Sequence, residues 1–268
     1  MSGICVAKAA CALLLAAGMT LGGQETPSQA EQDRMISAMR DYAADYTAKL
    51  PNFICQEVVS QFEAGRKPTK WKQGDTLTSK LIYNNGKEER TLLLVNDKSV
   101  DGNHRGWRRP LTTAGEFGLW LTNVFDPATQ TRFTWAGWED LSGHHLAKFD
   151  YAVSQEHSTL SLSLSDLATA VVAYHGTVWA DPQTGDVWKI VTEAQDIPKA
   201  VRTRSSVTTI DYNAVPIGGK TYLLPVSAEV IMATDTNHIR NEMRFEAYRK
   251  FEAESTISFG DGSAGPKQ

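Results

Sequence analysis

The chain has 268 residues, which is the length of one large domain or of two small ones. Its hydrophobic fraction of 41% and charged fraction of 22% are ordinary for a globular protein, which excludes a collagen, a coiled-coil rod, a wholly disordered chain and a multi-span membrane protein. The formal net charge of −4 argues against a dedicated nucleic-acid-binding protein.

Residues 1–23 have the pattern of a secretory signal peptide. A short stretch with one basic side chain, Lys8, precedes an uncharged run rich in Ala and Leu over residues 9–21, and Gly22 and Gly23 follow it. This apolar run is too short to span a bilayer, and no later one is long enough. We predict a soluble periplasmic or secreted protein that begins between Met19 and Gln24; an uncleaved N-terminal anchor is the alternative.

Signal-peptide cleavage would leave a single cysteine in the mature chain. Cys5 and Cys11 lie in the predicted signal peptide, so Cys55 remains alone and cannot form an internal disulfide or a zinc site. Its neighbours Phe53 and Ile54 are apolar, which predicts a buried and unreactive thiol.

A helix is predicted over residues 29–49. Ser28 and Glu31 have the spacing of a capping box, and the apolar residues that follow recur at helical intervals. Pro51 ends this pattern, so the helix should present one apolar face to the rest of the protein.

A second, shorter helix is predicted between residues 113 and 126. Thr113 and Glu116 again have capping-box spacing, and Asp126-Pro127 ends the segment. Its apolar face consists of Phe117, Trp120, Leu121 and Val124.

From residue 53 onward the chain is dominated by segments with the period of two that β-strands show. Turn residues separate consecutive strands at Asn85-Gly86, at Ser142-Gly143, at residues 181–186 and at Gly218-Gly219. The predicted strands are residues 76–83, 88–95, 132–138, 145–153, 160–164, 174–180, 187–194, 206–212, 221–233 and 243–251. Residues 166–173 fit either a short helix or a loop, and residues 260–268 are predicted to be a disordered tail.

Consecutive hairpins favour an antiparallel sheet, and the two apolar helix faces need a surface on which to pack. We therefore predict an α+β fold in which a large curved antiparallel sheet, an unclosed barrel, carries both helices on its concave face. Residues 30–259 contain no linker rich in Pro, Gly and Ser, so residues 24–259 are predicted to form a single domain.

No catalytic or metal-binding pattern stands out in the sequence. Gly260, Gly262 and Gly265 have dinucleotide-binding spacing, but only three residues follow and no helix can form there. The adjacent His144 and His145 would point to opposite faces of a strand, and no nucleophile elbow or phosphate-binding loop is present. We predict a protein without catalytic residues, metal or cofactor, and hence not an enzyme.

Two loops combine basic and aromatic residues in this acidic protein. Such loops could contact an anionic component of the cell envelope or an acidic partner; the alternative is that both are simply solvated. The residues are Arg66, Lys67, Lys70 and Trp71 in the first loop and Arg105, Trp107, Arg108 and Arg109 in the second.

The aromatic residues on predicted strands could join the second helix in lining one apolar pocket. The alternative is that they fill an ordinary hydrophobic core. The predicted ligand-binding residues are Phe117, Trp120, Leu121, Val124, Trp135, Trp179 and Trp188.

The segment YHGTVWADPQTGDV, residues 174–187, resembles the strand-turn-strand of the LolA-, LppX- and RseB-like periplasmic proteins. The order of signal peptide, leading helix and long hairpins is similar, and residues 50–53 also resemble secreted members of this group. The resemblance implies an unclosed antiparallel barrel with helices in its mouth that binds acyl chains or lipoproteins. It carries over no particular lipoprotein-contact residue.

These patterns together predict an exported, non-catalytic binding protein that holds a lipid or a lipidated partner in an apolar groove. Two alternatives stay open at this point. One is a periplasmic sensor or interaction protein of the same fold without a lipid ligand, and the other is a cell-envelope hydrolase.

Overall fold

The computed structural model describes residues 25–100, 115–165 and 168–251. The predicted signal peptide, the predicted disordered tail and the residues of the second basic-aromatic loop lie outside these ranges. Among the described residues, no helix is both long and apolar enough to cross a membrane.

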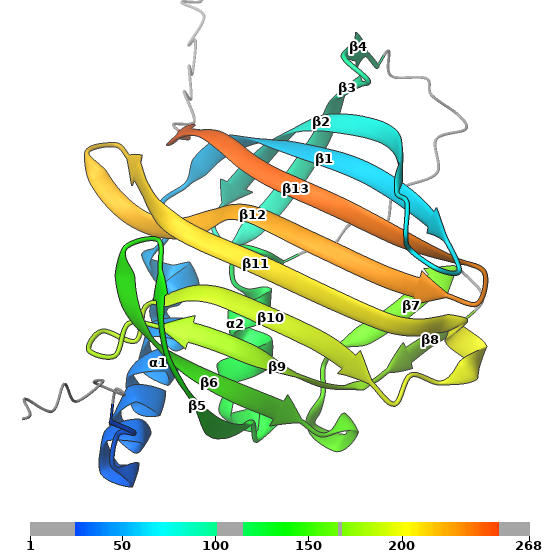
Figure 1. Ribbon diagram of the computed structural model, residues 1–268. Coiled ribbons are helices and arrows are strands. Elements are labelled where there is room, and N and C mark those ends of the chain that lie inside the picture. Colours follow the sequence, from blue (N-terminus) through cyan, green and yellow to red (C-terminus); the bar gives the residue numbers. More distant parts are fainter. Residues whose placement is uncertain (1–24, 101–114, 166–167, 252–268) are drawn as a thin grey trace, which may run out of the picture.

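Eleven antiparallel strands form one large curved sheet, in the order β4-β3-β2-β1-β13-β12-β11-β10-β9-β6-β5 (Figure 1). The remaining two, β7 (Ser161–Ser165) and β8 (Ala168–Val171), pair only with each other. The strands of the large sheet are β1 (Phe53–Gly65), β2 (Lys72–Asn84), β3 (Lys87–Val95), β4 (Lys98–Ser99), β5 (Arg132–Leu141), β6 (His144–Val153), β9 (Ala173–Ala180), β10 (Val187–Gln195), β11 (Thr203–Ile217), β12 (Lys220–Thr234) and β13 (Asn237–Lys250).

Two pairings in this sheet join strands that are not neighbours in the sequence. β1 pairs with the last strand, β13, and β6 pairs with β9 because β7 and β8 leave the sheet between them. The strands β4 and β5 stay as separate edges, so the sheet does not close into a barrel. The predicted unclosed antiparallel architecture is therefore confirmed.

The tight turns occur where the sequence predicts them. Asn85 and Gly86 have φ values of 51° and 76°, so both central residues of the β2–β3 hairpin are left-handed. Ser142-Gly143 and Gly218-Gly219 also have positive φ at both positions. Paired left-handed residues give a turn twist that matches the right-handed twist of the flanking strands.

Replacing Gly86 with Val should lower the free energy of unfolding by about 1–2 kcal/mol, because a β-branched residue is strained at φ 76°. A Cβ at this position would have no atom within 4 Å, so backbone strain is the only expected cost. Urea denaturation measures the change. An unchanged unfolding midpoint would contradict the left-handed turn.

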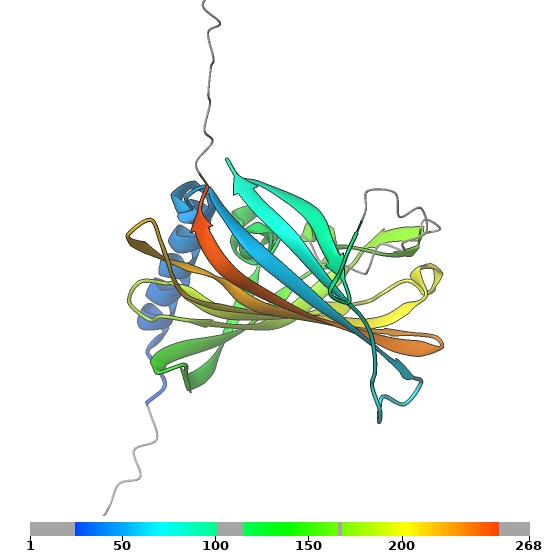
Figure 2. The same cartoon turned by 90° about the horizontal axis from the view of Figure 1, so that it is seen from above.

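Helix α1 (Gln29–Lys49) begins with the predicted capping box. The Ser28 side chain accepts a hydrogen bond from the backbone N–H of Glu31, and the Glu31 carboxylate accepts one from the backbone N–H of Ser28. Its buried face consists of Met35, Met39, Ala43 and Tyr46. This face packs on the concave side of the sheet (Figure 2).

Helix α2 (Leu119–Phe125) also packs on the concave side, but it begins later than predicted. Gly118, with φ 140°, is the N-cap and offers no side-chain cap. Glu116 and Phe117 precede the helix, and Thr113 lies outside the described residues. The capping-box prediction is wrong for α2, because the N-cap is Gly118, and the Glu116 carboxylate pairs with Arg90.

The end of α2 agrees with the sequence prediction, whereas the segment after β7 differs from it. Asp126 ends α2 and caps the short 3-10 turn Pro127–Thr129, as the Asp-Pro pair predicts. The segment predicted as helix or loop over residues 166–173 instead contains strand β8, which pairs with β7. In this segment, pairing with β7 provides the backbone hydrogen bonds of β8, which the local sequence pattern does not specify.

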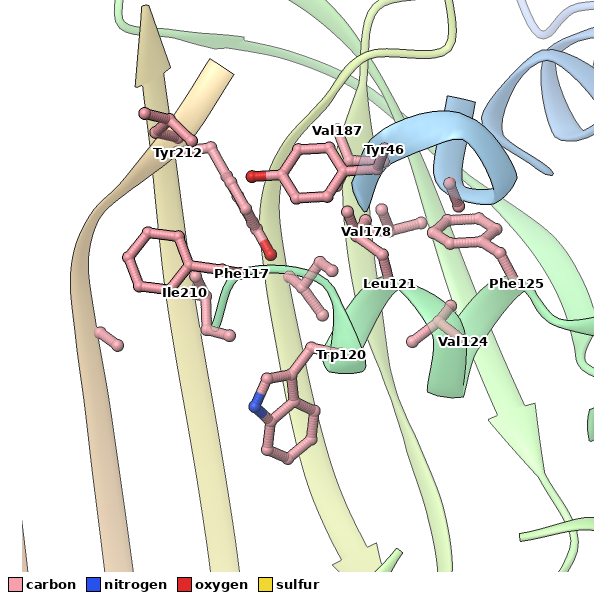
Figure 3. Packing of buried hydrophobic residues seen from close by; sticks show 14 of the residues in the cluster. Tyr46, Phe117, Trp120, Leu121, Val124, Phe125, Val178, Val187, Ile210 and Tyr212 are labelled. Atoms are coloured by element: carbon pink, nitrogen blue, oxygen red, sulfur yellow. The ribbon is translucent and has the colours of Figure 1, made fainter. Parts of the chain in front are cut away.

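The main hydrophobic core lies between the two helices and the concave face of the sheet (Figure 3). Leu121 and Val124 of α2 are fully buried against sheet residues that include Val178 and Ile210. Beside them, Phe53 stacks on Tyr83 with ring centroids 5.0 Å apart, and Phe117 lies 5.2 Å from Phe53. This aromatic group anchors the chain just before α2.

Candidate functional site

A cavity of about 360 Å³ lies between α2, the strand β7 and the concave face of the large sheet. Three neighbouring strands, β10, β11 and β12, form its floor. The described residues that line it are Leu119, Trp120, Asn123, Thr159, Leu160, Ser161, Leu162, Ser163, Thr192, Ala194, Ser206, Thr208, Val230 and Met232.

The periodicity of each element explains why these residues share the cavity. Thr192 and Ala194, Ser206 and Thr208, and Val230 and Met232 are three pairs at positions i and i+2, so each pair projects from one face of its strand. Residues 120 and 123 are three positions apart, which puts them on one face of α2. The cavity is thus built from regular elements whose side chains are held in place on both walls.

The lining combines apolar and small polar side chains. Among its described residues none carries a charge, and hydroxyl groups alternate with Leu, Val, Met and Ala side chains. Its volume lies at the lower end of small-molecule sites, which span roughly 300–1,000 Å³. Leu119, at the start of α2, is 51% exposed, which is unusual for a large apolar residue beside a cavity.

Two hydrogen bonds hold the helical wall of the cavity in place. The Tyr174 hydroxyl donates to the backbone carbonyl of Asn123, and the Thr159 hydroxyl donates to Asn123 Oδ1 at 2.8 Å. On the sheet wall, Thr192 Oγ1 lies 2.6 Å from the Tyr151 hydroxyl. The walls are therefore fixed by bonds to residues on both sides of the cavity.

One polar group of a lining residue is buried without a hydrogen-bond partner among the described residues. Trp120 is 7% exposed, and its buried Nε1–H meets no acceptor. Ser206 and Thr208, on the floor of the cavity, are 7% and 5% exposed. Buried polar groups are nearly always paired, so the indole N–H is an exception beside the cavity.

Of the predicted ligand-binding residues, Trp120 lines the cavity. Leu121 and Val124 instead belong to the core between the helices and the sheet (Figure 3). Phe117 lies in the aromatic group beside Phe53. Trp135 packs near the β5 edge, with its ring centroid 5.2 Å from that of Phe149. The apolar face of the second helix is thus mostly core.

Trp179 and Trp188 do not join the other predicted residues. They form a separate cluster with Leu146. Trp179 alternates with Val178 and Ala180, which face the helices, so its side chain lies on the opposite face of the sheet. The structure therefore does not bring the predicted tryptophans together around one pocket.

The first basic-aromatic loop lies between β1 and β2. Arg66, Lys67 and Lys70 are exposed. Trp71 is half-buried, because its ring stacks on the guanidinium of Arg240, with the carbon Cζ 4.8 Å from the ring centroid. The second predicted loop, Arg105, Trp107, Arg108 and Arg109, lies outside the described residues.

A buried ion cluster lies just before α2. Arg90 contacts three carboxylates: its Nε is 3.1 Å from Glu57, its Nη1 is 2.8 Å from Glu88, and its Nη2 is 3.0 Å from Glu116. Glu57 and Glu116 are 2% and 0% exposed. Burial raises the pKa of Glu57, against the attraction of Arg90, which lowers it.

The cysteine and the two adjacent histidines considered in the sequence analysis each pack against, or lie beside, neighbouring residues of the fold. Cys55 is 2% exposed, and burial raises the pKa of its thiol to about 12, so the reactive thiolate is strongly disfavoured, as the prediction of an unreactive cysteine requires. The ring of His144 lies tilted against that of Trp188 with the centroids 3.8 Å apart, and His145 Nδ1 lies 2.7 Å from Asp140 Oδ1. Within the described ranges no group of three or more His, Cys, Asp or Glu could hold a metal ion.

Sequence reasoning missed most of the residues that line the cavity. Leu160 and Leu162 were recognisable as one face of a strand, but nothing in the sequence says that this strand lies across the sheet. Ser206 and Thr208 alternate with apolar residues as on any strand, so no local signal separates a cavity-facing hydroxyl from a solvated one.

No protein-family model matches the sequence, and no curated protein matches it. Solved structures give likenesses of fold. A domain named for outer membrane lipoprotein sorting, from Vibrio parahaemolyticus, is 10% identical, covers 86% of this chain and 96% of its own, and has a TM-score of 0.39.

Two further solved structures are similar to a comparable degree. A DUF1329 family protein from Desulfovibrio piger is 10% identical with a TM-score of 0.41, covering 82% of this chain and 95% of its own. A LolA superfamily protein from Nitrosomonas europaea is 9% identical with a TM-score of 0.31, covering 81% and 94%. The third description names the LolA superfamily, to whose group residues 174–187 show the resemblance described above.

Proposed function

We propose that the protein is an exported, non-catalytic binding protein that holds the apolar chain of a lipid or of a lipidated partner in the cavity beside α2. The apolar part of the ligand would lie against Leu160, Leu162, Val230 and Met232. The signal-peptide pattern of residues 1–23 supports the export part of this proposal.

The single observation that carries the proposal is the cavity itself. Protein interiors are close-packed, and voids larger than a water molecule are rare. A partly open space of about 360 Å³, lined by apolar and small polar side chains beside an exposed Leu119, offers a concave surface against which an apolar ligand could pack.

The proposal predicts that the purified protein binds N-phenylnaphthylamine, an uncharged apolar fluorophore, with one-to-one stoichiometry. Replacing Ala194 with Phe should fill part of the cavity and weaken this binding by at least about tenfold. Fluorescence titration measures the affinity. Mass spectrometry of an organic extract of the protein, purified from the soluble exported fraction, should identify the natural lipid.

The matched control is Val191→Phe, which adds a ring on the same strand. Val191 alternates with Thr192 and packs with the Trp179 cluster, so the added ring lies on the opposite face and should leave fluorophore binding unchanged. If Ala194→Phe does not fold, Leu119→Arg at the exposed cavity wall provides the same test. Absence of both fluorophore binding and extracted lipid would reject the carrier function and favour a sensor or interaction protein.

A further inference from the structure

Exposed basic side chains gather at one end of the large sheet, beside the cavity. We infer that this end docks on the surface of an anionic lipid bilayer. The docking surface lies outside the cavity, so it goes beyond the proposed function, and a bilayer bound there would bring the cavity next to lipid.

Three connections between strands meet at this end: the β1–β2 loop, the β10–β11 connection and the β12–β13 turn, at the right of Figure 1. Asp235 in the β12–β13 turn joins them. Arg66 Nε, from the β1–β2 loop, donates to the backbone carbonyl of Asp235 at 3.0 Å, and Nε of Arg204, near the start of β11, lies 2.8 Å from Asp235 Oδ1. The fold therefore brings basic residues from distant parts of the sequence into one surface.

This surface is positively charged, although the whole chain has a net charge of −4. Residues 66–72, 196–204 and 235–236 carry seven basic and two acidic side chains, which gives a net charge of +5. The basic residues, all of them exposed, are Arg66, Lys67, Lys70, Lys72, Lys199, Arg202 and Arg204. Counting Glu63 and Asp75 on the flanking strands as well lowers the net charge to +3, so this end stays positive in an acidic protein.

Most of these charges have no carboxylate beside them. Among the described residues, the one ion pair that the seven basic side chains form joins Arg204 to Asp235, and Arg66 donates to a backbone carbonyl instead. Basic residues near an anionic bilayer each strengthen the attraction on the order of fivefold. Several exposed cations on one surface are therefore enough for reversible binding to anionic headgroups.

An anionic bilayer suits this surface better than a folded acidic protein does. The charges are spread over three connections on long side chains, and mobile headgroups can adjust to such an arrangement. A stable protein interface needs apolar or aromatic anchors at its centre. Trp71 is half-buried, and its ring already stacks on the guanidinium of Arg240, with Cζ 4.8 Å from the ring centroid, so it is not a free anchor.

The cavity lies next to this surface. Ser206 of β11 and Met232 of β12 line the cavity and are paired across the two strands. Arg204 precedes Ser206 by two residues, which is roughly 7 Å along a strand. Val201, in the 3-10 turn between β10 and β11, packs with the cavity-lining Leu162. A bilayer at this end would thus be close to the cavity, and a bound apolar chain would have a short path into lipid.

The test is flotation of the protein, purified from the soluble exported fraction, with lipid vesicles. It should float with phosphatidylcholine vesicles that contain about one-third phosphatidylglycerol and not with vesicles of phosphatidylcholine alone, and about 0.5 M NaCl should release it because salt screens exposed charges. Lys67→Glu combined with Lys70→Glu should lower the partition coefficient for the anionic vesicles at least about tenfold.

Lys87→Glu combined with Lys220→Glu is the matched control. Both lysines are exposed and lie at hairpin turns at the opposite end of the sheet, so this pair changes the net charge equally but should alter the partition coefficient less than about twofold. An equal loss in the two double variants, equal binding to neutral vesicles, or no binding to vesicles would overturn the docking surface. Retention on heparin without vesicle binding would likewise overturn the bilayer and favour a soluble polyanion.

Binding of N-phenylnaphthylamine, measured without vesicles, reports on the cavity alone. If the protein binds the fluorophore but no vesicles, the docking surface is rejected and the carrier function stands. If it binds vesicles but neither the fluorophore nor an extracted lipid, the carrier function is rejected and the docking surface stands.

Discussion

Replacing Arg90 with Met is expected to lower the free energy of unfolding by about 3–5 kcal/mol at neutral pH. The guanidinium is the shared partner of Glu57, Glu88 and Glu116, and two of these carboxylates are almost completely buried. Removing the cation leaves these charges desolvated and without this partner. Chemical denaturation of the variant beside the wild type measures the loss.

The same variant should show a characteristic pH dependence. Burial raises the pKa of Glu57 above its ordinary value of 4.5 even with Arg90 present, and loss of Arg90 should raise it further. A carboxyl whose pKa is raised by folding destabilises the protein above that pKa, and this cost disappears as the pH falls through it. The deficit of Arg90→Met should therefore be greatest at neutral pH and shrink towards pH 4.5.

Lys189→Met is the control for loss of an ordinary surface charge pair. Lys189 Nζ lies 3.1 Å from Asp211, and both side chains are partly exposed, so its removal should cost about 1 kcal/mol or less. An Arg90→Met deficit no larger than that of Lys189→Met would contradict a buried cluster. The cluster also bears on the site, because Glu116 directly precedes the segment that leads into α2 and the cavity wall.

Replacing Gly185 with Ala is expected to cost about 2–5 kcal/mol, from left-handed strain and from overpacking together. Gly185 lies in the turn between β9 and β10 with φ 76°. A Cβ there would overlap the carbonyl group of Ala38 and lie 2.5 Å from the backbone nitrogen of Met39. Because these are backbone atoms of α1, the helix or the turn would have to move away.

Gly86→Ala separates the two contributions. Gly86 has the same φ of 76°, but a Cβ there would have nothing within 4 Å. Gly86→Ala should therefore lower the free energy of unfolding by only about 1–2 kcal/mol, from backbone strain alone. Thermal or urea unfolding of both variants gives the difference, which reports the close approach of α1. If the two glycine variants lose the same stability, the turn does not pack against α1 as described.

The sequence determined the elements whose formation depends on neighbouring residues. Asn85-Gly86 forms its hairpin because these two residues tolerate positive φ, and α1 starts at its capping box because both partners lie within one turn. The turn at residues 181–186 forms for a similar reason: Asp181 Oδ1 accepts from the backbone N–H groups of Gln183 and Thr184. Each of these signals is complete within a few residues.

Other features needed partners far along the chain. Glu116 had the spacing of a helix cap, but the approach of Arg90 from β3 gave its carboxylate a buried partner, and α2 began later. The segment after β7 was ambiguous because its strand pairing depends on a neighbour that the local pattern does not identify. In both cases the partner that a residue or segment takes depends on which distant segments the fold brings together.

The cavity was decided by tertiary structure alone. Period-two alternation shows that Trp179 and Val178 lie on opposite faces of a strand, but only the docking of α1 and α2 determines which face becomes the core. Likewise, Trp120 belongs to the core but also borders a cavity, which lies between α2, β7 and the strands β10, β11 and β12. A cavity exists where several elements fail to fill the space between them, and that space depends on all of their positions at once.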